Sequence, residues 1–205
     1  MSLLIILRKQ LSPNRFNELL LNSIDTGEGD NAIICSGFFQ ENAFSASFTT
    51  GLCCTLRRNK INLTTIGVYN NIWVPQYKTF CDNLVSCGNT VSAKKTRNNK
   101  WHAKIFILKK GNDPIFGIIG SSNMTSRAFG ICRDFNFEAD VVLWDTSKSK
   151  INTLCQQQTE TNNDNIDDVI YADYNNERNR NKTVMDRLRD LEKELDIDNL
   201  NDLTE

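Results

Sequence analysis

The chain alternates between short apolar stretches and amphipathic stretches, and this alternation limits the fold more than any other feature. Residues 32–39 and 137–144 have the apolar and β-branched character of buried strands. Residues 15–24 and 42–59 space their apolar side chains three and four positions apart, as amphipathic helices do. Strands and helices that follow one another in this way predict an α/β sandwich with a central mixed β-sheet flanked by helices.

The pattern divides the chain into three parts. Residues 1–155 carry the strand and helix signals and are expected to form one domain. Residues 156–180 are polar and acidic, which favours a linker or loop. Residues 181–205 space leucines for a C-terminal amphipathic helix, which would pack on the domain or on a partner.

The seven cysteines and the single histidine limit the chemistry that is available. Seven is an odd number, and no two cysteines have C-x-x-C spacing. This usage favours reduced, mostly buried thiols in a cytoplasmic protein over a disulfide framework. With one histidine and no cysteine ligand spacing, a zinc site is not expected either. No stretch approaches the ~20 apolar residues that a membrane-spanning helix needs.

Charge is distributed unevenly along the chain. The net charge is −1 for the whole protein, but residues 94–133 hold nine basic side chains and one acidic side chain, whereas residues 134–205 are strongly acidic. A basic segment attracts polyanions through Coulomb forces and counterion release. Ordinary solvated lysines on a hairpin would give the same composition, so charge alone leaves both readings open.

The single histidine lies in this basic segment, at the start of a predicted β-hairpin. Residues 101–110 and 115–122 flank a turn at residues 111–114. His102 and Lys104 are two positions apart, so they share one face of a strand. Ser121 and Asn123 end the partner strand with the same spacing. An imidazole, an ammonium, a hydroxyl and a carboxamide would meet there, and this set suits attack on a phosphodiester and stabilisation of its oxygens.

These residues resemble the H-x-K…G-S-x-N signature of the phospholipase D superfamily. His102 and Lys104 match its first part, residues 120–123 (Gly-Ser-Ser-Asn) match its second, and Glu138 matches a downstream carboxylate that orients the histidine. There are two departures. Lys109 stands where the family often has an aspartate, with Asp113 four residues later, and the gap between the two parts is longer than usual.

The resemblance implies a phospholipase D-like α/β sandwich and a mechanism. Members with one motif form homodimers, in which one histidine attacks phosphorus and the other protonates the leaving oxygen. Applied to this chain, it implies a covalent phosphohistidine at His102, phosphate contacts from Lys104 and Asn123, with Ser121 beside them, and a histidine held by Glu138. It implies no metal and no other cofactor.

Small members with one motif are typically nucleases, so the resemblance and the basic segment favour a metal-independent nuclease of restriction-endonuclease type acting on DNA. The expected nucleic-acid-binding residues are Lys94, Lys95, Arg97, Lys100, Arg127 and Arg133. No DNA-reading motif is recognisable, which points to a separate recognition domain or subunit. Two alternatives remain open: a lipid-cleaving or lipid-transferring enzyme of the same superfamily, and a catalytically silent nucleic-acid-binding module.

Overall fold

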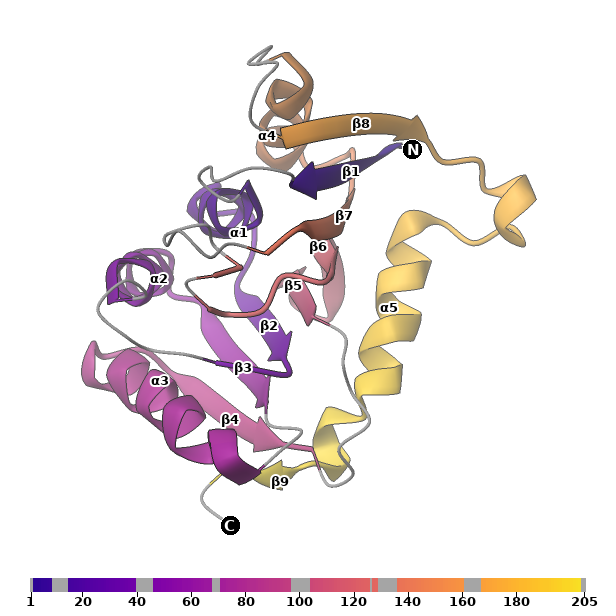
Figure 1. The fold of residues 1–205 in the computed structure, drawn as a ribbon. Coiled ribbons are helices and arrows are strands. Elements are labelled where there is room, and N and C mark those ends of the chain that lie inside the picture. The colour runs from indigo at the N-terminus through magenta and orange to yellow at the C-terminus, as the bar shows by residue number, and fades with distance from the viewer. Residues whose placement is uncertain are drawn as a thin grey trace.

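A mixed β-sheet organises the protein (Figure 1). The computed structural model describes residues 2–8, 15–39, 46–67, 71–96, 104–125, 127–128, 136–160 and 167–203. Within these ranges the strands are β1 (Ser2–Arg8), β2 (Asn31–Ser36), β3 (Asn62–Gly67), β4 (Val91–Lys95), β5 (Lys104–Lys110), β6 (Asp113–Gly120), β7 (Glu138–Trp144), β8 (Asp167–Asp173) and β9 (Asn201–Asp202). Their order in the sheet is β8-β1-β7-β6-β5-β2-β3-β4-β9.

The sheet combines parallel and antiparallel pairs. Strand β3 runs parallel to both β2 and β4, and the other neighbouring strands are antiparallel. The parallel pairs are joined by crossover helices, as parallel pairing requires. The predicted α/β class with a central mixed sheet is therefore confirmed.

Helices cover both faces of the sheet, unequally (Figure 1). The first face packs against α1 (Arg15–Asp25), α2 (Ala46–Asn59), α3 (Val74–Ser86) and α4 (Ser149–Glu160), and the second against α5 (Val184–Leu195). Three short 3-10 helices complete the described elements: η1 (Asn71–Trp73), η2 (Glu177–Asn179) and η3 (Ile197–Asn199).

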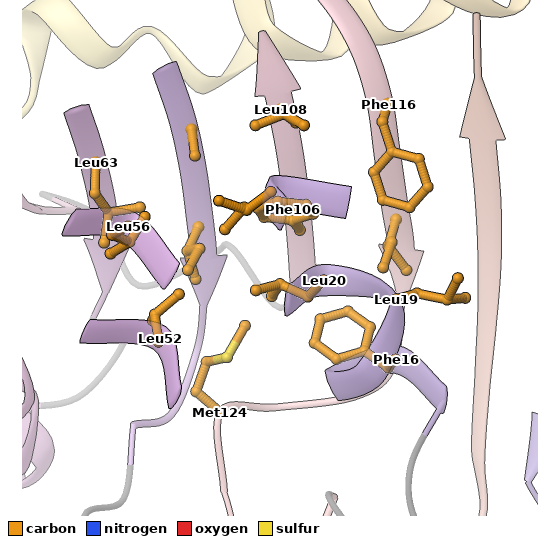
Figure 2. Packing of buried hydrophobic residues seen from close by; sticks show 14 of the residues in the cluster. Phe16, Leu19, Leu20, Leu52, Leu56, Leu63, Phe106, Leu108, Phe116 and Met124 are labelled. Carbon is orange, nitrogen blue, oxygen red and sulfur yellow. The ribbon is translucent and has the colours of Figure 1, made fainter. Parts of the chain in front are cut away.

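The larger core lies under α1–α4, on the first face of the sheet. Figure 2 shows Phe16, Leu19 and Leu20 of α1 beside the strands that carry Phe106 and Phe116, and all five residues belong to one buried cluster. These side chains are fully buried. Because the periods of helix and strand both place apolar groups at this contact, burial on this face is the main source of hydrophobic stabilisation.

The hairpin expected around the motif is confirmed as β5 and β6. Lys104 lies opposite Gly120 at one end, and the chain turns at Gly111 and Asn112 at the other, with Gly111 at a positive φ of 59°. The register shifts between Leu108 and Lys109. The long gap in the motif therefore extends the hairpin at the end away from Lys104.

The segment 156–180, expected to be a linker or loop, contains regular structure instead. Helix α4 continues to Glu160, and residues 167–173 form β8, which pairs with β1 along seven residues. The polar sequence misled the prediction because β8 lies at the edge of the sheet, where one side of the strand needs no buried partner.

The C-terminal part crosses the second face of the sheet from β8 to β4 (Figure 1). The amphipathic helix expected in residues 181–205 is present as α5. Thr183 caps its first turn: the Asp186 amide donates to the Thr183 hydroxyl at 3.0 Å, and the Thr183 amide donates to the Asp186 carboxylate at 2.8 Å. Of the two packing partners considered, α5 contacts the domain.

Candidate active site

The candidate site lies at one end of the sheet strands. Strands β2 and β6 end there, at Ser36 and Gly120, while β5 and β7 begin there, at Lys104 and Glu138. Because the strands alternate in direction, residues that are distant in sequence meet at the same end of the strands. We call this end of the sheet the motif edge.

Lys104 is the first residue of β5 and is almost completely buried, with 3% of its surface exposed. Burial lowers the pKa of the Lys104 ammonium, while the charges of Glu138, Cys35 and Asp140 act in the opposite direction. A buried ammonium is costly unless negative charge is close by. Lys104 is therefore a buried amine whose charged form is favoured by the neighbouring Glu138 and Asp140 carboxylates.

Glu138, the first residue of β7, is held by two donors. One carboxylate oxygen accepts the hydroxyl of Ser121, and the other accepts the side-chain amide of Asn136 at 3.0 Å. The Ser121 hydroxyl in turn accepts the backbone N–H of Ala139 at 3.0 Å. Glu138 is 6% exposed. These bonds fix the carboxylate of a residue expected to orient a histidine.

Asn123 lies beside the end of β2. The hydroxyl of Ser36 is 3.4 Å from the Asn123 side-chain oxygen, donates to the carbonyl of Phe38 at 2.7 Å, and accepts the amide of Met124 at 3.2 Å. Since the carboxamide oxygen faces Ser36, the amide nitrogen is the group of Asn123 that can donate to a phosphate oxygen.

The structure thus brings Ser121 and Glu138 into direct contact and places Lys104 and Glu138 within electrostatic reach. His102 lies outside the described residues, so its role stays a prediction. It precedes Lys104 by two positions. A lysine and an asparagine that donate to phosphate oxygens, next to a carboxylate that accepts from an imidazole, form a set suited to nucleophilic attack on phosphorus.

The predicted nucleic-acid-binding residues divide into three groups. Lys95 lies at the end of β4, in register with Gly67 of β3 and on the same sheet face as Lys104. Its neighbour Lys94 lies on the opposite face, where its ammonium is 2.9 Å from Asp202 of β9. Arg127 is exposed, and its carbonyl accepts from the Arg8 guanidinium at 3.4 Å. The remaining three, Arg97, Lys100 and Arg133, lie outside the described residues.

The departures from the motif have a structural role on the second face of the sheet. Lys109, which stands at the usual aspartate position, forms an ion pair with Glu192 of α5. Asp113 accepts from the Arg189 guanidinium of the same helix at 2.9 Å. Both residues lie at the far end of the hairpin from Lys104. They contact α5 and do not contribute to the motif edge.

Three residues near this site, Asp140, Ser36 and Arg8, were not predicted from the sequence. Asp140 lies two residues after Glu138 on β7, so the period of a strand was a signal that could have found it. Ser36 gave no such signal, because its contact with Asn123 depends on β2 pairing with β5. Arg8, at the end of β1 and in register with Glu138, is buried and donates to the carbonyl of Ala128.

Among the residues that the structure describes, no group of three or more His, Cys, Asp and Glu side chains could hold a metal ion. Among the same residues, no helix combines the length and the apolar character that crossing a bilayer requires. Metal-independent chemistry remains a prediction from the resemblance.

The sheet is mixed, and its motif edge carries Ser121 and Asn123 of the G-S-x-N part of the motif together with the hydrogen-bonded Glu138. These features define a phospholipase D-like α/β domain. The match to a family model specifies it further. The chain belongs to the family described as NgoFVII restriction endonuclease N-terminal PLD domain, whose model matches residues 15–171. The resemblance noted in the sequence is therefore confirmed. Helix α5 and strand β9 follow the matched region.

Solved structures with a similar fold have low sequence identity to the chain. Polyphosphate kinase from Porphyromonas gingivalis aligns with a TM-score of 0.50 and 11% identity over 78% of this chain and 26% of that one. Nuc from Salmonella typhimurium, a phospholipase D family member, aligns with a TM-score of 0.49 and 15% identity over 78% and 93%. NucT from Helicobacter pylori gives 0.42 and 16% over 78% and 96%. No curated protein sequence matches the chain.

Proposed function

We propose that the protein is a metal-independent nuclease that cleaves phosphodiester bonds in DNA, with one active site built by two copies of the chain. The observation that carries the proposal is the Glu138 carboxylate at the motif edge, which accepts hydrogen bonds from Ser121 and Asn136 and lies within electrostatic reach of Lys104. The family description, which names a restriction endonuclease, supports the class of reaction.

The proposed reaction proceeds in two displacements at phosphorus. His102 of one subunit attacks, so that an N–P bond forms and a P–O bond breaks, and the partner's His102 donates its proton to the leaving oxygen. Water then attacks the phosphohistidine, giving a proton to the partner's His102 as the N–P bond breaks. Lys104 and Asn123 donate to the nonbridging oxygens, and Glu138 fixes the imidazole tautomer.

A homodimer follows from the count of histidines. The chain contains one His, and the proposed reaction uses two, one as nucleophile and one as general acid. A site on a two-fold axis supplies both from the same sequence position. Lys104 and Glu138 would then be present twice, once on each side of the phosphate.

Basic residues near the motif edge support nucleic acid as the substrate. Lys95 lies on the same face of the sheet as Lys104, and the spacing of the β-strands puts the two residues about 14 Å apart. At that distance Lys95 could contact a nearby phosphate of the same DNA strand whose scissile phosphate lies at Lys104. Arg127 is exposed beside Ala128, which Arg8 holds. We assign sequence recognition to a separate domain or subunit.

The test is cleavage of supercoiled plasmid DNA in the presence of EDTA by the wild-type protein and by the His102→Ala variant. We expect nicked or linear DNA with the wild type and a loss of at least about a thousandfold with the variant, because the nucleophile and the general acid are removed together. DNA binding should persist in His102→Ala, as measured by gel mobility.

Three results would contradict the proposal in different ways. Inhibition by EDTA that magnesium reverses would contradict a metal-independent reaction. Equal binding and no cleavage by both proteins would favour the silent nucleic-acid-binding module. Release of headgroups from phospholipid vesicles, without cleavage of DNA, would favour the lipid enzyme.

A further inference from the structure

We propose that Asp140 is a positioning residue of this site, which holds the Ser121–Asn123 turn through Ser122 and faces Lys104 across Gly120. This inference rests on the proposed phosphodiesterase function. It deepens that function by assigning a second carboxylate to the machinery, besides the Glu138 expected from the motif.

The sheet register places Asp140 in line with Lys104. Lys104 lies opposite Gly120 on β6, and Gly120 lies opposite Asp140 on β7. Residues opposite one another in antiparallel strands point to the same face of the sheet. Gly120 therefore lies between Lys104 and Asp140 on this face of the sheet.

The absence of a side chain at Gly120 is a condition of this arrangement. A Cβ added there would lie 1.9 Å from a carboxylate oxygen of Asp140 and 2.5 Å from the carbonyl of Ala139. The Asp140 carboxylate thus occupies the space above Gly120, on the side toward Lys104. The motif therefore requires glycine at position 120 because any side chain there would collide with the Asp140 carboxylate.

Both oxygens of Asp140 bind Ser122. One accepts the Ser122 hydroxyl at 2.6 Å, and the other accepts the Ser122 backbone N–H at 3.3 Å. Ser122 is fully buried and Asp140 is 3% exposed. Because Ser122 stands between Ser121 and Asn123, fixing its backbone sets the direction of the two side chains that border the motif edge.

Asp140 also contributes to the charge around Lys104. The titratable groups within electrostatic reach of the ammonium include Glu138 and Asp140 on β7 and Cys35 on β2, and His102 precedes Lys104 on the chain. Burial raises the pKa of Asp140, and its bonds from Ser122 oppose that rise. When ionised, Asp140 favours the charged form of Lys104, the form that binds phosphate.

The experiment compares Asp140→Asn with wild type. Asparagine keeps the shape and can accept the Ser122 amide and donate to its hydroxyl, so it removes the charge but not the bonds. Asp145→Asn is the matched control: it makes the same change just after β7, about 17 Å along the strand direction. The readouts are plasmid cleavage from pH 6 to pH 10, and the titration of Lys104 by NMR of protein labelled with carbon-13 lysine. Lys104→Met assigns its signal.

We expect Lys104 to titrate at lower pH in Asp140→Asn than in wild type, the alkaline limb of cleavage to move the same way, and turnover to fall roughly 10- to 100-fold. Asp145→Asn should match wild type in all three. An unchanged Lys104 titration in folded Asp140→Asn would overturn the pairing of Asp140 with Lys104, and unchanged cleavage by Ser122→Ala, which removes the hydroxyl bond to Asp140, would overturn its role in holding the turn.

Two provisions keep the outcome decisive. If Asp140→Asn does not fold, Ser122→Ala serves instead: cleavage lowered at least fivefold supports the proposal, and unchanged cleavage contradicts it. The Lys104 titration does not depend on turnover. A wild-type protein that cleaves nothing would therefore refute the proposed nuclease, while the titration would still judge the pairing of Asp140 with Lys104.

Discussion

At the scale of single residues, a buried thiol beside the motif edge and an exposed thiol on α2 should differ in reactivity. Burial raises the pKa of Cys35 to about 12, and the charge of Lys104 lowers it only in part. Cys54 of α2 is exposed. We therefore expect N-ethylmaleimide to modify Cys54 in the native protein at neutral pH, and Cys35 to react only after unfolding. Mass spectrometry of labelled peptides measures both, and rapid native labelling of Cys35 would contradict its burial.

The same thiol sets a direction for stability at high pH. Folded Cys35 holds its proton more tightly than an unfolded thiol, whose ordinary pKa is 9.0. Its contribution is fully present below pH 9 and is lost as the pH rises toward about 12. Urea unfolding should therefore require less denaturant as the pH rises above 9, and Cys35→Ala should reduce this dependence.

At the scale of elements, α5 is a structural part of the domain. Leu188 is fully buried against the second face of the sheet, so close to Gly117 of β6 that a Cβ there would lie 2.6 Å from it. We expect Leu188→Ala to lower the free energy of unfolding by about 2–5 kcal/mol. Glu194→Ala, at an exposed position of the same helix, should change it by less than about 0.5 kcal/mol. Equal urea midpoints for the two variants would show that α5 does not support the fold.

Elements were predictable from the sequence where their pattern is local. Helix α1 and the β5–β6 hairpin follow from spacing and turn residues alone. Strand β8 was missed, because residues 167–173 acquire their structure by pairing with β1, more than 150 positions earlier. A window of sequence contains no information on that partner, and tertiary context overrides local propensity in such cases.

The candidate site also contains residues that a local motif predicts and residues that only strand pairing brings into place. Lys104, Ser121, Asn123 and Glu138 could be named in advance because a motif fixes their order in the sequence. Ser36 could not, since its contact with Asn123 arises from the pairing of β2 with β5. Lys94 and Lys95 show the limit of charge counting: they are neighbours in sequence, but the strand directs them to opposite faces, and Lys94 pairs with Asp202.

At the scale of the whole molecule, the proposed site on a two-fold axis predicts how subunits of different activity combine. Wild-type and His102→Ala chains are mixed in equal amounts, unfolded together and refolded, so that they pair at random. If each dimer has one site that needs both histidines, only the wild-type pairs are active, and activity falls to about one quarter of an all-wild-type sample. If each subunit acts alone, activity falls to roughly one half. Separating the two requires that refolded wild type regains its activity, and light scattering must show a dimer under the same conditions. A value of one half, or a monomer with full activity, would rule out the shared site, because a single His102 would then have to serve as both nucleophile and acid.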